Sequence, residues 1–432
     1  MTYEEKTKTV ISLLIIIPVI IGLSVGTHIA GIYKNLEGKP SQLVWNENDK
    51  YNIDKDAYIL TVDKKSDFKI LNLTDLQLSE GMSQKRINRT YKLVRQLIQE
   101  TNPSIVTFTG DNTWLKNSKK AVKRFVREID EICIEFDVPW APILGNHDAE
   151  SDVDGNWIFD EYLQAQNIIF NYKENANRSK DLAKGPINIS GIGNYVINVK
   201  SAIDDEIFHS MIMMDTHSLG SYSTIDSVNI GSEKINLTGL NESEKLKLNG
   251  WITKDDYIFA PSENVNNNEY TVVGTGYDYI KKNQIHWYEY MVKGLAEYNG
   301  TPVESTLFIH IPLPEYNMAA KIYEPINDGF TKDENGNFGM LREPICSPYY
   351  NSGMFEKIVE LNSTKNVICG HEHKNNFSVL YRGVRLTYAT KTGDGHDWVE
   401  DGSVCGGTVL EFDETEKLTV SPIYLNYDML NN

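Results

Sequence analysis

The sequence predicts an α/β fold in which parallel strands alternate with helices. Between residues 68 and 148, three apolar runs with polar ends (FKILNLTDLQ, PSIVTFTGDN and VPWAPILGNHD) alternate with two segments of helical periodicity, residues 84–100 and 119–137. This β-α-β-α-β order implies parallel strands, right-handed crossovers and helices that cover the sheet. The polar ends then fall at the carboxyl ends of the strands, where open α/β sheets bind ligands.

The rest of the chain continues this pattern with more strands. NYVINV and HSMIMMDTHS predict paired strands, residues 278–299 predict a helix, and STLFIHIPLPEY, NVICGHEHKNN and RGVRLTYAT predict strands with polar ends. GGTVLEFDE and LTVSPIYL predict a closing hairpin, and the polar residues 221–275 predict an inserted excursion. We therefore expect one domain over residues 66–428, preceded by a polar tether at residues 33–65.

The composition limits the classes of function. With 432 residues and 41% hydrophobic residues, the chain is large and apolar enough to bury a sizeable core, which excludes a mostly disordered protein. Its formal net charge is −18. A protein that binds the phosphate backbone of nucleic acid needs a basic face, so we expect no nucleic-acid partner.

The N-terminus carries an uncharged apolar run at residues 10–25, VISLLIIIPVIIGLSV, which follows Lys6 and Lys8. With residues 27–32 it reaches the length of a membrane-spanning helix, about 20 residues. An uncleaved signal anchor and a cleaved signal peptide both fit, and we favour the anchor. This predicts that residues 1–32 form a single N-terminal membrane helix at the cell membrane, with the rest of the chain outside; cleavage of the leader would give a secreted protein.

Five polar clusters at strand ends are candidates for metal binding. Asp, Asn and His provide oxygen and nitrogen ligands that suit Mn, Fe or Zn. A lone GD or GH is a weak signal, whereas an ordered series, each piece on its own strand end, is a strong one. The clusters are Asp75 with Gln77, Gly110-Asp111-Asn112, Asn146-His147-Asp148, His310 in IHIPLPEY, and His371 with His373 in GHEH.

Over residues 68–412, this series resembles the calcineurin-like metallophosphoesterase family. DTHS near residue 215, YDYIKKNQIHWYE, HIPLPEY and GHEHKNN look like the branch related to purple acid phosphatases. The resemblance implies a four-layer α/β/β/α sandwich, which agrees with the β-α-β reading. It also implies two divalent metal ions, with Mn, Fe or Zn as the candidates.

The resemblance further implies a role for each candidate ligand. Asp111 would bridge the two ions. We call the sites of the two ions position 1 and position 2. Position 1 would be completed by Asp75, Gln77 and His373, and position 2 by Asn146, His310 and His371.

Four more residues are candidates for contact with substrate or ligands. His147 would stabilise charge on the phosphate or protonate the leaving oxygen, with Asp148 orienting its ring. Asn112 and Asn375 flank metal motifs, where they would bind phosphate oxygens, orient ligands or cap the strand ends.

The sequence departs from the family pattern at two positions. Gln77 stands where the first motif usually has histidine, so it either ligates weakly or forms a pocket wall. Trp114 stands where the purple branch has a tyrosine, so we expect no purple colour. Asp215 and His217 mimic an Asp-x-His motif, but the ligand set is already filled, and we interpret them as a decoy.

These observations predict an extracytoplasmic, dinuclear metal-dependent phosphoesterase that hydrolyses a phosphate monoester or diester. Two divalent ions about 3.5–4 Å apart clamp a phosphate and lower the pKa of a bound water, so that hydroxide attacks at neutral pH. The alternatives are a nuclease, against which the acidic balance speaks, and a catalytically silent surface-binding module that retains the fold. Gln77 is the best argument for the silent module.

Overall fold

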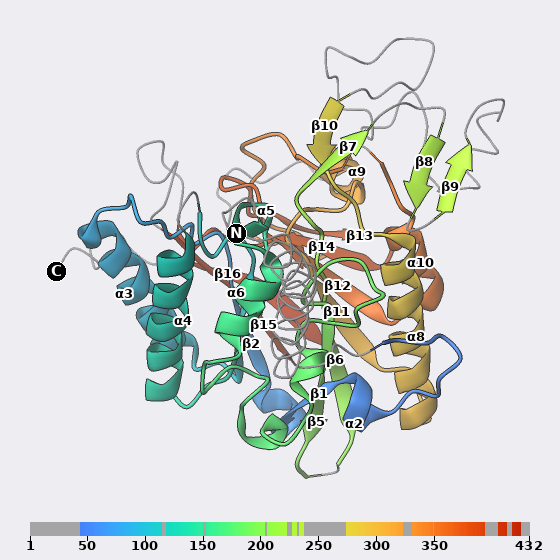
Figure 1. Ribbon diagram of the computed structural model, residues 1–432, viewed down its shortest axis with the longest axis horizontal. Coiled ribbons are helices and arrows are strands. Elements are labelled where there is room, and N and C mark those ends of the chain that lie inside the picture. The colour runs from blue at the N-terminus through green and yellow to red at the C-terminus, as the bar shows by residue number, and fades with distance from the viewer. Residues whose placement is uncertain are drawn as a thin grey trace, which may run out of the picture. The chain divides into compact units, whose positions relative to one another are not determined.

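The computed structural model describes residues 44–114, 118–149, 153–203, 205–222, 227–230, 233–236, 274–322, 331–348, 350–393, 405–412 and 417–424. They form a mixed α/β fold with two main sheets, as expected (Figure 1). The apolar run at residues 10–25 lies outside these ranges. Among the helices that are described, none is long and apolar enough to cross a bilayer.

The smaller main sheet has five strands in the order β16-β15-β2-β3-β4. Its parallel strands are β2 (Lys69–Leu73), β3 (Ile105–Thr109) and β4 (Trp140–Ile143), joined by α3 (Gln84–Thr101) and α4 (Ser118–Glu135). The antiparallel hairpin β15 (Gly406–Phe412) and β16 (Leu418–Tyr424) adds to the free edge of β2. The expected β-α-β-α-β order and the closing hairpin are both confirmed.

Helix α3 shows how the sequence fixes these elements. It begins at Ser83, whose hydroxyl accepts a hydrogen bond from the amide of Arg86 at 3.4 Å, and it ends at Asn102 in the left-handed region. Its buried apolar residues recur every three or four positions, which places them on one face. That face packs into a core with residues of both main sheets, such as Leu71 and Met211.

The larger sheet has seven strands in the order β1-β5-β6-β11-β12-β14-β13. Strands β6, β11, β12 and β14 are parallel neighbours. Strand β5 pairs with β6, as the sequence predicted, and runs antiparallel to it. The strands are β1 (Tyr58–Val62), β5 (Tyr195–Ser201), β6 (Ile207–Met213), β11 (Glu304–Phe308), β12 (Thr364–Cys369), β13 (Ser378–Tyr381) and β14 (Val384–Tyr388).

A second core covers the other face of the larger sheet. Helices α8 (Lys282–Asn299) and α10 (Met354–Leu361) supply Trp287 and Ile358, which pack with Ile212 and Val367 of the strands. The remaining helices are short: α2 (Ile53–Asp56), α5 (Asn146–Ala149), α6 (Gly155–Tyr162) and α9 (Glu315–Ile322). The two sheets therefore pack face to face, with α3 and α4 on one side and α8 and α10 on the other (Figure 1).

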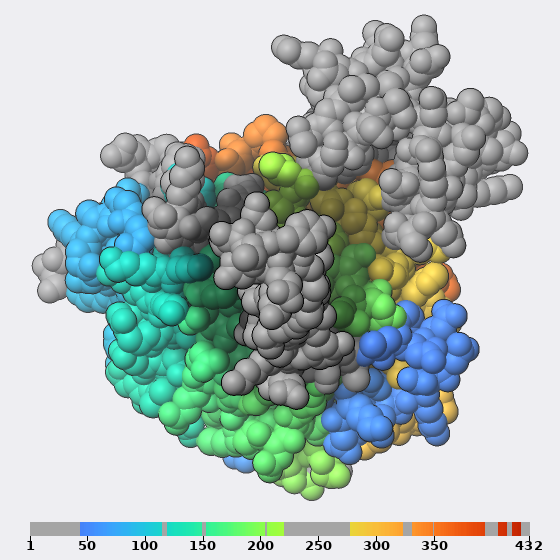
Figure 2. Space-filling view, viewed as in Figure 1, coloured from blue at the N-terminus to red at the C-terminus, as the bar shows by residue number. Residues whose placement is uncertain are grey.

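The stretch before residue 66 is not only a tether. Tyr58–Val62 forms β1, an edge strand parallel to β5, because its first residues are apolar and become buried. Trp45 contacts Tyr290 of α8 edge-on, with ring centroids 5.7 Å apart. Figure 2 shows the same neighbourhood on the surface, where blue residues near the start of the described chain lie against gold residues of α8. The folded domain thus includes residues that we assigned to the tether.

The excursion expected near residues 221–275 begins and ends in a two-stranded stem. Strands β7 (Leu219–Tyr222) and β10 (Gly274–Tyr277) are antiparallel, with Tyr277 opposite Leu219. A second antiparallel pair, β8 (Ser227–Ile230) and β9 (Glu233–Asn236), lies within the excursion, and its other residues are outside the described ranges.

Candidate metal centre

The carboxyl ends of the parallel strands of both sheets meet, and the candidate ligands come from the loops there. Asp75 follows β2, Asp111 follows β3, and Asn146 opens α5 after β4. From the larger sheet, His310 follows β11, and His371 follows β12. Because parallel strands align their carboxyl ends, residues far apart in the sequence converge.

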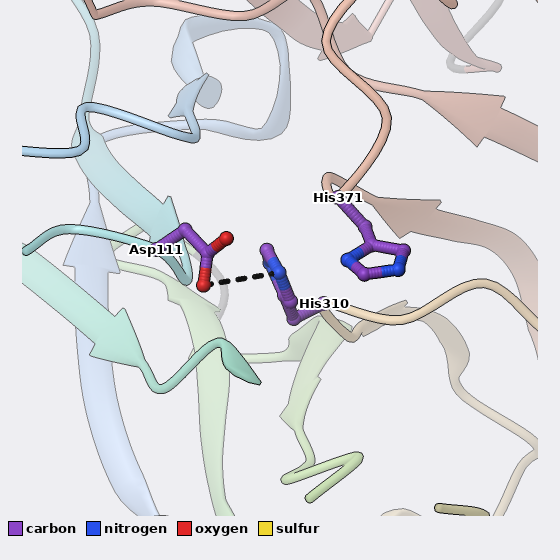
Figure 3. Close-up of side chains that lie close together, drawn as sticks. All are labelled: Asp111, His310 and His371. Atoms are coloured by element: carbon purple, nitrogen blue, oxygen red, sulfur yellow. Dashed lines mark ion pairs between the residues drawn. The ribbon is translucent and has the colours of Figure 1, made fainter. Parts of the chain in front are cut away.

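The described residues contain two groups of ligand atoms that lie within 4.8 Å of one another, and both include Asp111. One group adds Asp75 and His373, and the other adds His310 and His371. Figure 3 shows Asp111 directed at His310, whose Nε2 lies 3.3 Å from Asp111 Oδ1, with His371 beside them. The first group holds the Asp and His residues expected at position 1, the second holds those expected at position 2, and Asp111 belongs to both.

The backbone at this site is strained. Four candidate ligands have left-handed φ values, with +53° at Asp75, +48° at Gln77, +51° at Asp111 and +82° at His371. Residues other than glycine rarely adopt this region, and each such residue costs on the order of 1 kcal/mol. The turns that impose this cost direct the side chains towards one another, which is the pattern of a functional site.

Glycines in the GNHD and GHEH motifs allow the loops to approach closely. A Cβ at Gly145 would lie 2.2 Å from Asp111 Oδ1, and one at Gly370 would lie 2.1 Å from Thr74 Oγ1. No side chain fits at either position, so these motifs require glycine just before the ligand-bearing residues.

Three buried oxygen atoms of the site lack a hydrogen-bond partner within the described part of the chain. They are Oδ1 of Asp75, Oε1 of Gln77 and Oδ2 of Asp111. An unpartnered buried polar atom costs about 1–3 kcal/mol, so a cluster of three calls for a ligand. Carboxylate and amide oxygens combined with imidazole nitrogens suit Mn, Fe and Zn, so the residues fit a pair of divalent ions.

Neighbouring histidines lower the pKa of the two aspartates at the site, which favours the ionised carboxylates that bind metal. Burial by itself would raise the pKa of Asp111, but His310, His147 and His371 outweigh it and hold the pKa well below its usual range. The same balance, mainly with His373 and His310, lowers the pKa of Asp75. Burial and His310 lower the pKa of His371 to about 3, so its imidazole is neutral, as ligation requires.

His310 is fixed in the orientation that position 2 needs. Its Nδ1 donates to the carbonyl of Thr109 at 2.8 Å, which turns Nε2 towards Asp111 and towards Asn146 Oδ1 at 3.1 Å. Although burial opposes it, Asp111 raises the pKa of His310 to about 10. A metal at position 2 would therefore displace a proton from this ring.

Gln77 is held differently. Its Nε2 donates to Nε2 of His373 at 2.9 Å, and this bond takes up the lone pair that His373 would give to a metal. The ring of His373 lies 3.6 Å from Asp75 Oδ1, too far for a hydrogen bond. Ligation by His373 at position 1 thus requires its hydrogen bond with Gln77 to break.

His147 is more accessible than the buried ligands. Its side chain is 29% exposed, its ring Nε2 lies 3.9 Å from Asp111 Oδ2, and Trp114 packs against it edge-on. Its backbone amide donates to Asp111 Oδ1 at 2.9 Å. This places an imidazole at the edge of the candidate metal centre, where a phosphate would meet it.

Asp148 anchors loops. Its carboxylate accepts hydrogen bonds from the amides of Gly145, Asn112 and Thr113 and from the Thr113 hydroxyl, at 2.8–3.2 Å. Burial and Asp111 raise the pKa of Asp148 to about 6. These bonds join the loops after β3 and β4, whereas its expected orientation of the His147 ring stays a prediction.

Asn112 and Asn375 are almost fully buried, and their side chains bond to the protein itself, although Oδ1 of Asn112 has no hydrogen-bond partner among the described residues. The Asn112 amide donates to the carbonyl of Ile143 and to the hydroxyl of Tyr162. Asn375 accepts from the amides of Arg342 and Glu343 and donates to the Glu343 carbonyl. Of the roles that the sequence left open, this arrangement favours loop and strand-end capping over contact with substrate.

The sequence did not reveal three residues that contact the position 2 ligands: Thr216, Ser218 and Tyr277. The first two belong to the DTHS motif, which the sequence pattern marks as a decoy, and Asp215 and His217 are indeed absent from both described ligand groups. Tyr277 packs edge-on against His371 with ring centroids 4.4 Å apart. The position of DTHS at a strand end was the only available signal.

Among the comparisons with known proteins, the match to a family model points to the family that the motifs resemble. The model of the calcineurin-like phosphoesterase family matches residues 68–227, which hold Asp75, Gln77, Asp111 and Asn146. A dimetal phosphatase from Danio rerio is a structural neighbour with 12% identity and a TM-score of 0.43, over 84% of this chain and 99% of that chain.

Two similar proteins differ in what their names say about activity. One, from Arabidopsis thaliana, is called "Probable inactive purple acid phosphatase 14" and is 25% identical over 346 residues, 76% of this chain and 70% of that protein. Another, called "Phosphatase DCR2", from Saccharomyces cerevisiae, is 25% identical over 343 residues, 75% of this chain and 47% of that protein. The chain is thus similar to the calcineurin-like phosphoesterase family over residues 68–227, and to proteins named as purple acid phosphatases over about three quarters of its length.

Proposed function

We propose that this protein hydrolyses phosphate monoesters or diesters with a pair of divalent metal ions. The observation that carries the proposal is the pair of ligand groups that share Asp111, together with the unpartnered oxygens of Asp75, Gln77 and Asp111. Position 1 would be formed by Asp75, Asp111, Gln77 and His373, and position 2 by Asp111, Asn146, His310 and His371.

When bound, two such ions supply Lewis-acid charge to the phosphate and lower the pKa of water. The residues of the chain do the rest. The Asp111 carboxylate, which belongs to both ligand groups, would hold both ions and offset the repulsion between their positive charges. His147, accessible at the edge of the site, stabilises charge on the phosphate or donates a proton to the leaving oxygen. Buried walls around Asp75 and His310 keep water away from the carboxylates.

A second function, a catalytically silent binding module, has two observations in its favour. Three relatives are named as probably inactive, and Gln77 hydrogen bonds to His373 where a ligand pair would be. In this alternative the fold and the loops persist while turnover is absent. The proposals differ in turnover rather than in structure, so they are separated by kinetics.

The test compares the purified full chain before and after metal removal. The metal-free protein is reloaded with Mn, Fe or Zn and assayed on p-nitrophenyl phosphate, its bis-ester, nucleotides and DNA. We expect metal-dependent hydrolysis that Asp111→Asn abolishes. Asp137→Asn, which changes an exposed aspartate on the surface, serves as the matched control and should retain the rate. Two bound ions without turnover on any of these substrates would favour the silent module.

We also propose that residues 1–32 anchor the protein in the cell membrane with the phosphoesterase domain outside. The support is the uncharged run at residues 10–25, preceded by Lys6 and Lys8. Protease added to intact cells should degrade the domain, and carbonate washing should leave it in the membrane fraction. Protection from protease would contradict an outside location, and release of a shortened chain into the medium would indicate cleavage.

A further inference from the structure

One structural unit contacts two of the three ligands that belong to position 2 alone, and the chain neighbour of the third. It consists of the loop at residues 215–218 and Tyr277, the last residue of β10. Its contacts reach His310 through the neighbouring amide, Asn146 through its carbonyl, and His371 through its ring. We name Thr216, Ser218 and Tyr277 the brace.

Thr216 fixes the loop that carries His310. Its hydroxyl accepts a hydrogen bond from the amide of Ile311 at 2.9 Å, and its side chain is buried. Because Ile311 is bonded directly to His310, this contact limits how far the imidazole can move from Asp111.

Ser218 fixes the backbone of Asn146. Its hydroxyl donates to the carbonyl of Asn146 at 3.2 Å. The side-chain Oδ1 of the same Asn146 lies 3.1 Å from His310 Nε2. The hydrogen bond from Ser218 therefore helps to hold Asn146 at a fixed distance from His310.

Tyr277 supports the ring of His371. The two rings meet edge-on at 89°, with centroids 4.4 Å apart, close enough to restrict rotation of the imidazole. The amide of Asp278 donates to the carbonyl of Ser218 at 2.9 Å. This bond ties Tyr277 to Ser218, so the contacts with His371 and Asn146 form one unit.

Asp215 and His217 fix the brace to the fold. Asp215 accepts from the amides of Ile192 at 2.8 Å and His217 at 2.7 Å. His217 Nε2 lies 2.9 Å from Gln284 Oε1 in α8, and Gln284 donates in turn to the carbonyl of Asp215 at 2.7 Å. The Asp-x-His pair therefore has a positioning role, which explains its likeness to a ligand motif without ligation.

Position 1 is held by groups outside the brace, which include the amide of His371, a donor to Asp75 Oδ2 at 3.1 Å. The hydroxyl of Thr74 donates to Asp75 Oδ2 at 2.8 Å, and Thr392 accepts from the amide of Thr74 at 3.2 Å. Gln77 and His373 hold each other. The hydrogen bonds and the ring contact that define the brace go instead to the ligands of position 2 and their neighbours.

We infer that Thr216, Ser218 and Tyr277 are positioning residues for metal position 2, so that changing them weakens one of the two metal sites and spares the other. The inference rests on the proposed dinuclear centre. Its readout is metal affinity, which can be measured without any substrate.

The experiment titrates the metal-free full chain with Mn²⁺ in a calorimeter, where two binding steps are expected. His310→Ala assigns the step of position 2, and His373→Ala assigns that of position 1. Tyr277→Ala should then weaken position 2 by about 10-fold, the lower end for loss of a group that orients a ligand, and change position 1 by less than about 2-fold. Tyr277→Phe keeps the ring and should retain the affinity of the unaltered chain.

A thermal melt shows whether Tyr277→Ala is folded. If it is not, Ser218→Ala and Thr216→Val are milder variants for the same test. Both should lower the metal affinity of position 2 only. Tyr298→Ala removes an exposed tyrosine of α8 that contacts Tyr51 and should change neither step. Equal weakening of both steps, or no change in the folded variants, would overturn the role of the brace and leave the proposed function standing. A chain that binds no metal would overturn both.

Discussion

The two candidate metal positions share Asp111 but differ in how they are supported. At position 1, Gln77 donates to His373, so two ligands bond to each other. At position 2, His310 Nε2 likewise lies 3.1 Å from Asn146 Oδ1, but outside groups also hold the ligands: Thr109 orients His310, and the brace contacts Asn146, His371 and the residue next to His310. Both positions must therefore give up a hydrogen bond between their own ligands to bind metal, and position 2 is held in addition by the brace.

This difference separates two ways of preparing a metal site. A ligand pair that hydrogen bonds to itself stabilises the metal-free state and lowers affinity. A ligand supported by other residues keeps its lone pair directed at the ion, at the cost of a larger scaffold. The brace comes from a strand end and an inserted stem, so position 2 depends on more of the chain.

The largest expected effect comes from the residue that the positions share. Asp111→Ala should remove both ions, because it deletes the bridging carboxylate, and should reduce hydrolysis by several orders of magnitude. His373→Ala and His310→Ala should each remove one ion. Elemental analysis of the purified variants measures this directly. Retention of one full equivalent of metal in Asp111→Ala would show that the positions do not share this residue.

His147 should affect rate without affecting either position. His147→Ala should lower kcat by about 10²–10⁴-fold, the usual contribution of a general acid, with both ions retained. His286→Ala, which changes an exposed histidine of α8, is the matched control. If His147→Ala lost metal as well as rate, the residue would belong to the support of Asp111 instead.

The buried Glu315 tests the surroundings of position 2, because it opens α9 just after the His310 loop. Burial raises the pKa of Glu315 to about 7, although Asn351 donates to it at 2.6 Å. In the unfolded chain, Glu315 has the ordinary pKa of a glutamate, about 4.3. Between about pH 4.3 and pH 7 the folded state therefore binds one more proton than the unfolded state, and the free energy of unfolding falls as the pH rises.

Glu315→Gln, which mimics the protonated form, should therefore lessen this loss. We subtract the unfolding free energy of the unaltered chain from that of the variant at each pH. This difference should be larger at pH 8 than at pH 4 by up to about 3 kcal/mol. Denaturant unfolding at the two pH values measures it, with the exposed Glu297→Gln as control. An equal pH dependence in Glu315→Gln and the unaltered chain would contradict the raised pKa.

The smallest expected effect is at Gln77. Gln77→His replaces an amide oxygen, a weak metal ligand, by an imidazole and removes the hydrogen bond from the amide to His373. The metal affinity of position 1 should therefore rise by at most about 10-fold, or about 1.4 kcal/mol. Activity should be retained or rise. Unchanged affinity at both positions would assign Gln77 to the pocket wall.

The sequence motifs predicted the candidate metal ligands far better than the hydrogen bonds that hold the loops around them. Each candidate ligand follows an apolar strand, and because parallel strands end at one edge, their convergence was predictable from order alone. The glycines of GNHD and GHEH carried the same information, since only glycine allows the loops to approach. The bonds of Asp148, Asn112 and Asn375 were not predictable, because a polar side chain at a strand end has the same sequence signature whether it caps a loop or faces substrate.

Two structural assignments also required tertiary contacts. Residues 58–62 are too short to be distinguished from a linker, and only pairing with β5 makes them a strand. Asp215 and His217 look like ligands in sequence, and only their bonds to Ile192 and Gln284 direct them away from the metal groups.

The amino-acid sequence by itself determined the alternation of strands and helices, the closing hairpin and the donors that surround Asp111. These depend on periodicity and residue type, which are local properties of the chain. The tertiary structure decided which oxygens remain unpartnered and which residues form the brace. Such features are distances between segments up to about 300 residues apart, as between Gln77 and His373, and only the packing of the two sheets sets those distances.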